Sequence, residues 1–65
     1  MTKAEVAKVE SAVLACDPRA TVYWDWEHET LTVTCSAECT ETVRTALDPR
    51  PEGLQLLVIR FQAAA

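Results

Sequence analysis

The sequence contains little glycine, few basic residues and no long hydrophobic run, and each scarcity excludes a class of protein. Its one glycine, Gly53, lies outside any phosphate-cradling motif, and no acid–base pair stands out, so we expect neither a cofactor nor an enzymatic activity. Six basic residues are outnumbered by ten acidic ones, and the net charge of −4 argues against nucleic acid and anionic membranes as partners. The longest aliphatic run, residues 56–59, is far shorter than the ~20 residues of a membrane span.

The cysteine count and the N-terminal sequence bear on cellular location. Three cysteines are an odd number, and the charged N-terminal segment lacks the apolar core of a secretory signal. We therefore expect reduced thiols in a cytoplasmic protein. With 65 residues, the chain is expected to form one domain that spans residues 1–65.

The first segment has the pattern of an amphipathic helix. Thr2 and Glu5 have the spacing of a capping box, in which each side chain bonds the other residue's backbone N–H. Val6, Val9 and Val13 follow at the spacing of one helical face. The helix is expected to end at Asp17, because Pro18 disfavours the helical conformation of the residue before it.

Two strands are expected next, because apolar residues alternate with polar ones. One apolar row consists of Val22, Trp24 and Trp26, and the other of Leu31, Val33 and Cys35. A loop of either two or four residues places Trp26 opposite Leu31 and Trp24 opposite Val33, and the four-residue loop, residues 27–30, is preferred. All six apolar side chains then share one face of the sheet.

A second helix and a third strand complete the chain. Ser36 is expected to cap the helix, whose apolar face includes Cys39, Val43 and Leu47. The last strand, residues 54–61, is apolar on both faces, which is typical of a strand buried on both sides. Its two rows are Leu54, Leu56 and Val58 on one face, and Leu57, Ile59 and Phe61 on the other.

These elements predict an α+β fold in which two helices cover one face of a three-stranded sheet, in the order helix–strand–strand–helix–strand. The third strand should run parallel to the second, beside either the second or the first strand. This order resembles a ferredoxin-like domain, such as the heavy-metal-associated and ACT domains, that lacks its first strand. The Cys-x-x-Cys motif of the metal carriers is absent, so the resemblance implies a fold and no function.

Two groups of residues are weak candidates for metal binding. Cys35 and Cys39 lie across the junction between strand and helix, where a thiol near a helix N-terminus can ligate a soft metal or exchange disulfides. The more ordinary interpretation is that both are buried apolar residues of the core. His28 lies in an acidic turn and could join a metal site, although a solvated histidine at a loop tip is the commoner case.

The remaining signal indicates protein–protein interaction. Two helices can cover one face of the sheet, so one row of the third strand should meet solvent, a partner, or a lid formed by the loop at residues 48–53 or the C-terminal tail. We expect a small interaction module, a homo-oligomer or a subunit bound to a protein partner, that uses the exposed sheet face. A thiol-based metal or redox protein using Cys35 and Cys39 is the alternative. The residues expected at the interaction surface are Tyr23, Trp26, Leu57, Ile59 and Phe61.

Overall fold

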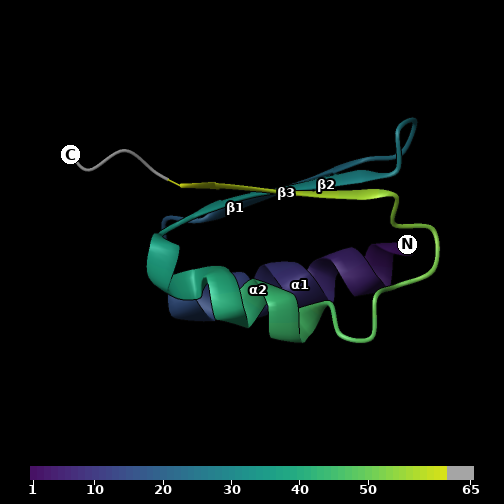
Figure 1. The fold of residues 1–65 in the computed structure, drawn as a ribbon. Helices are drawn as coiled ribbons and strands as arrows, with labels where there is room; N and C mark the ends of the chain where they lie inside the picture. The colour runs from purple at the N-terminus through teal and green to yellow at the C-terminus, as the bar shows by residue number, and fades with distance from the viewer. Residues whose placement is uncertain (62–65) are drawn as a thin grey trace.

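The computed structural model describes residues 1–61 and shows a layer of two helices against a three-stranded sheet (Figure 1). The elements are α1 (Lys3–Cys16), β1 (Thr21–Asp25), β2 (Thr30–Cys35), a 3₁₀ turn η1 (Ala37–Cys39), α2 (Thr40–Ala46) and β3 (Leu56–Phe61). The predicted fold class and element order are confirmed. The predicted tail, residues 62–65, lies outside the described residues.

The sheet has the strand order β1-β2-β3, with β2 in the centre. β1 is antiparallel to β2, and β3 is parallel to β2 and lies directly beside it. Of the two positions left open for the third strand, the structure therefore has the mixed sheet. β1 and β3 are both edge strands.

α1 begins and ends as its sequence predicts. The Glu5 N–H donates to Thr2 Oγ1 (3.2 Å) and the Thr2 N–H donates to Glu5 Oε1 (2.8 Å), which completes the capping box. At the other end, the Asp17 N–H donates to the Val13 carbonyl (2.8 Å). The Asp17 carboxylate also accepts the N–H of Ser36 (3.0 Å), which ties the end of α1 to the residue after β2.

The predicted hairpin register is wrong: each residue of β1 pairs with a β2 residue that is two positions earlier in the sequence than expected. Trp24 lies opposite Leu31, and Val22 lies opposite Val33. The reason is the carboxylate of Asp25, which accepts the backbone N–H groups of residues 27 and 28 and so ends β1 one residue earlier than expected. The four-residue loop is residues 26–29, and an even shift keeps the apolar row on the same face.

The second helix is shorter than predicted and starts differently. Ser36 makes no side-chain capping bond; its hydroxyl lies 3.3 Å from Cys39 Sγ. The first turn is the 3₁₀ turn η1, and α2 follows from Thr40, whose hydroxyl donates to the Ala37 carbonyl (2.9 Å).

The core lies between the helix layer and β2. Most of the predicted core residues are buried, whereas Val6 is only half-buried at its margin. The side chains buried most completely come from the two helices, η1 and β2, and they are Val9, Val13, Leu31, Val33, Cys35, Cys39 and Val43.

The loop between α2 and β3 is held at the end of the two layers. The amino group of Met1 donates to the Glu52 carbonyl (2.8 Å), and Arg50 donates to the carbonyls of Leu54 (3.2 Å) and Gln55 (2.8 Å). In Figure 1 the loop runs past the N-terminus and does not cross the outer face of the sheet. The expected alternative of a lid formed by this loop is therefore wrong.

Candidate interaction surface

The outer face of the sheet, opposite the helices, is uncovered by any described element (Figure 1). Tyr23, Thr32 and Val58 lie side by side across the three strands of this face. Tyr23 is 65% exposed, and Leu56, beside Thr30, is 54% exposed. We name Tyr23, Leu56 and Val58 together the outer patch; the threonines of β2 lie between Tyr23 on β1 and the row of Leu56 and Val58 on β3.

The parallel register decides which row of β3 faces outward. Leu57 and Ile59 lie beside Leu31 and Val33 on the helix side, and both pack against the core. Phe61 lies beside Cys35 on the same side but is 60% exposed. Of the predicted interaction residues, only Tyr23 therefore lies on the outer face, and of the two rows left open for β3 the outward one contains Leu56 and Val58.

β3 is less buried than is typical of a strand with apolar residues on both faces. No residue of β3 is fully buried, and its first and last residues, Leu56 and Phe61, are the most exposed apolar ones. The physical reason is its place in the sheet: β3 is an edge strand, covered on one side by β2 and open on the other. An edge strand of this composition is a site where another chain can pair.

The pairing of β3 with β2 determines which backbone N–H and C=O groups of β3 face the open edge of the sheet. The Glu29 carbonyl accepts the N–H groups of Gln55 (2.9 Å) and Leu56 (3.4 Å), and the parallel ladder begins at Leu56. The N–H and C=O of one strand residue point to the same side, and successive residues alternate. The backbone groups of Leu57, Ile59 and Phe61 therefore face the open edge.

The two tryptophans form a second exposed aromatic feature. Their rings meet edge to face, with centroids 5.8 Å apart and planes at 80°. Trp24 is buried, whereas Trp26, in the hairpin loop, is 57% exposed. Both line a shallow hollow of about 240 Å³ against α1, between Lys3 and Glu10. The structure thus places Trp26 at the surface, but apart from the outer patch.

His28 lies at the tip of the hairpin and is bound to a neighbouring acid. Its Nδ1 is 2.8 Å from Asp25 Oδ2, and the hydrogen bond to His28 is the main cause that lowers the pKa of Asp25. Within residues 1–61 no group of three histidine, cysteine or acidic side chains is arranged to hold a metal ion.

The candidate pair of thiols, Cys35 and Cys39, is not formed, and both cysteines are buried in the core. Cys39 is joined instead to Cys16 in a disulfide, with Cα atoms 6.0 Å apart, so the expectation of three reduced thiols is wrong. Cys35 is a free, buried cysteine, and burial followed by the charge of Asp17 raises the pKa of its thiol. One signal could have identified the partner: Cys16 ends the first helix and Cys39 begins the second, so an antiparallel helix pair brings them to the same end.

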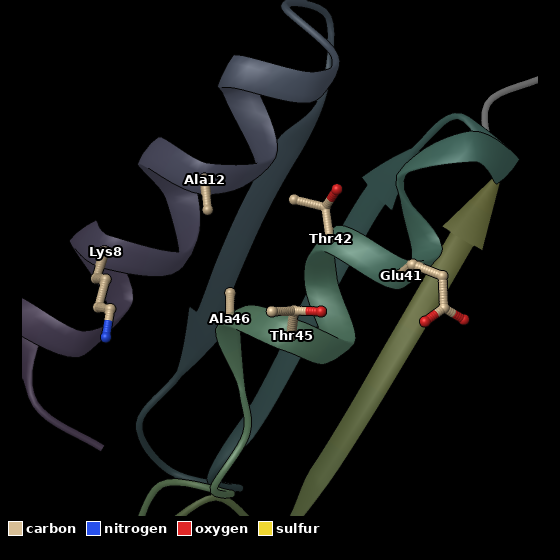
Figure 2. A pocket seen from close by; sticks show the side chains of 6 residues that line it. All are labelled: Lys8, Ala12, Glu41, Thr42, Thr45 and Ala46. Atoms are coloured by element: carbon tan, nitrogen blue, oxygen red, sulfur yellow. The ribbon is translucent and has the colours of Figure 1, made fainter.

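A surface hollow lies between the two helices, on the side away from the sheet. It encloses about 480 Å³ and is lined mostly by short side chains. Figure 2 shows Ala12 of α1 and Thr42, Thr45 and Ala46 of α2 around it, with Glu41 at one end. Lys8 is the basic group at this hollow, and no nucleophile with a neighbouring base lines it.

Comparisons with protein-family models, with curated proteins and with solved structures found no match. Among the residues that the structure describes, no helix has the length and apolar character needed to span a bilayer.

Proposed function

We propose that the protein is a small protein–protein interaction module that associates with further copies of itself through the outer patch. The observation that carries the proposal is the one-sided cover of the sheet. Both helices pack on the same face, so Tyr23, Leu56 and Val58 are left at the surface (Figure 1). Contiguous exposed apolar rows are uncommon on soluble monomers and mark contact sites.

The composition of this face suits association between identical copies. Each chain carries a net charge of −4, so two copies repel one another unless their contact surfaces are nearly neutral. The middle strand of the outer face carries uncharged threonines, the apolar row of β3 lies beside them, and Arg60 lies near one end of that row. The centre of an interface is depleted in charged residues, and a face made of threonines and apolar side chains meets that condition.

A matched pair of charge substitutions tests the proposal. Leu56→Lys introduces a charge in the outer patch, and Leu14→Lys introduces the same charge at an exposed leucine of α1 that is 38% exposed. We expect wild type at tens of micromolar to contain at least two chains by sedimentation or light scattering. Leu56→Lys should lower the mass, and Leu14→Lys should leave it unchanged. A monomeric wild type, or equal masses for all three proteins, would contradict the proposal.

A second candidate function is thiol–disulfide exchange, with Cys16 and Cys39 in place of the pair first considered. The observation that favours it is an exposed Cys16 bonded to a buried Cys39, because an attacking thiolate can reach the outer sulfur. Two electrons and two protons from a dithiol reductant convert the disulfide into two thiols. We keep the cytoplasm as the proposed location, where this bond would cycle and not persist.

Redox equilibration tests the second candidate. The protein is incubated in glutathione buffers, and free thiols are counted by alkylation and mass measurement. Half-reduction within the cytoplasmic range, about −220 to −320 mV, supports redox cycling. A bond that stays fully oxidised across that range would show a purely structural disulfide. Cys35→Ala should behave as wild type, because Cys35 takes no part in the bond.

A further inference from the structure

We infer that the unit of self-association is a dimer in which β3 pairs antiparallel with the β3 strand of a second copy. The paired edge is a different surface from the outer patch. The inference rests on the proposed function only where it assumes that two such dimers can also meet through their outer patches. Its starting point is the row of half-buried and exposed residues on the helix side of β3: Leu57, Ile59 and Phe61.

The area of the outer face is the first argument. Strands of about six residues at ~3.3 Å each, three abreast at ~4.8 Å, outline roughly 280 Å². A standard interface buries ~800 Å² per partner. The flat outline of one copy's face is therefore small beside the accessible area that a standard interface buries. Pairing two β3 edges makes a continuous six-stranded sheet and doubles this face.

The second argument is the self-complementary register. Because the backbone groups of Leu57, Ile59 and Phe61 face the open edge, a two-fold axis at Ile59 lets all three residues bond the second copy. Ile59 then pairs with Ile59 of the second copy, and Leu57 pairs with Phe61. This register forms on the order of six inter-strand hydrogen bonds and places apolar side chains opposite apolar ones on the helix side.

The third argument is that the edge of β3 lacks the features that prevent pairing. Open edges are ordinarily protected by proline, lysine, a bulge or an inward-pointing charge. The six residues of β3 include none of these; their only charge, Arg60, lies on the outer face beside Thr34. The other edge differs, because β1 ends in Asp25 and its helix-side Trp24 is already buried.

Charged groups of both signs lie on the helix side of this margin. Glu41 and Arg44 of α2 form an ion pair of 3.6 Å, and Arg44 lies at a hollow shared with Leu57 of β3. Figure 2 shows Glu41 on the side of α2 turned away from α1. Arg50 lines the same hollow, so a second copy that also has a net negative charge meets more basic than acidic groups at this margin.

Hydrogen exchange of single amides tests the inference directly. In a monomer, the N–H groups of Val58 and Arg60 bond β2, whereas those of Leu57, Ile59 and Phe61 are open to solvent. We expect wild-type protein at hundreds of micromolar to protect both sets. In Ile59→Lys, where two lysines would meet at the axis, the set at residues 57, 59 and 61 should exchange at least about tenfold faster at the same concentration.

The outcomes separate the inference from the proposed function. Ile59→Lys alters a half-buried residue, so Phe61→Lys, which alters an exposed one, is measured as a second variant. In both variants, protection of the Val58 amide shows that the sheet is intact. Unprotected amides at 57, 59 and 61 in wild type would overturn edge pairing, even if Leu56→Lys lowers the mass. Protection of these amides together with an unchanged mass for Leu56→Lys would support edge pairing and reject the outer patch.

Discussion

β2 and β3 lie side by side, yet the more hydrophobic of the two is the less buried. β2 carries a threonine at every second position and buries Leu31, Val33 and Cys35 completely. β3 consists of apolar residues except for Arg60 and buries none of them completely. The difference is position: β2 has a neighbour on each edge, and β3 has one. Hydrophobic content thus shows what a strand can bury, and strand order decides what it does bury.

The two strands also differ in how they are attached to the helix layer. The residue after β2, Ser36, is bonded to Asp17 at the end of α1, and the Cys16–Cys39 disulfide lies at the same end. β3 is positioned by the loop before it, through Arg50 and the left-handed Gly53. Substitutions near β2 should therefore affect the stability of the monomer more than matched substitutions in β3.

The largest effect is expected from the disulfide, which closes a sequence separation of 23 residues. Cys16→Ser should lower the free energy of unfolding by about 3 kcal/mol, because the unfolded chain loses a cross-link. Urea denaturation measures the loss. With a reductant present, wild type and Cys16→Ser should unfold at nearly the same urea concentration; a persisting gap would mean that the serine acts by another route.

The next largest effect on stability is expected from valine-to-alanine substitutions compared between β2 and β3. Val33→Ala removes methyl groups from a site that is 0% exposed and should cost roughly 1–3 kcal/mol. Val58→Ala, on the half-buried outer face of β3, should cost about 0.5 kcal/mol in dilute monomer. Equal losses in urea denaturation would refute the contrast between the strands.

A smaller effect is expected at Gly53, which turns the chain into β3. Its φ of +87° is strained for other residues, and an added Cβ would lie 2.6 Å from the Met1 nitrogen. Gly53→Ala should therefore cost about 1 kcal/mol. Removing Met1 from the Gly53→Ala protein relieves the contact with the added Cβ but leaves the backbone at residue 53 strained. Thermal unfolding should therefore show that part of the stability loss remains.

The smallest effect concerns Asp25, at the end of β1. Its folded-state pKa is lowered from an ordinary value of 3.8, so it stabilises the fold above the unfolded-state value. This contribution disappears as the pH falls through the lowered pKa. Asp25→Asn should unfold at a slightly lower temperature than wild type near pH 6, and the two should converge once the pH lies below the lowered pKa of Asp25. A difference that is constant with pH would exclude the charge as its cause.

Local patterns in the sequence predicted most of the fold. The capping box at Thr2 and the alternation around Val33 depend on neighbouring residues, and both were confirmed. The hairpin register was predicted wrongly because the side chain of Asp25 ends β1, which alternation alone does not reveal.

The candidate site was less predictable for the same reason. Which row of β3 faces outward depends on its pairing with β2, and the disulfide depends on how the helices pack. These are contacts between residues far apart in the sequence, and the pattern within one segment does not contain them. Tyr23 was placed correctly on the outer face because alternation along β1 is sufficient to assign it.

The central claim is that the apolar edge of β3 is completed by a second copy, and an isotope-filtered NOE measurement tests it most directly. Protein labelled with ¹³C and ¹⁵N is mixed with unlabelled protein, and only contacts between different copies are recorded. We predict cross-peaks between the Ile59 methyl groups of two copies and between Leu57 and the Phe61 ring. The absence of these cross-peaks in a sample shown by its mass to be oligomeric, or contacts confined to Tyr23 and Leu56, would contradict the claim.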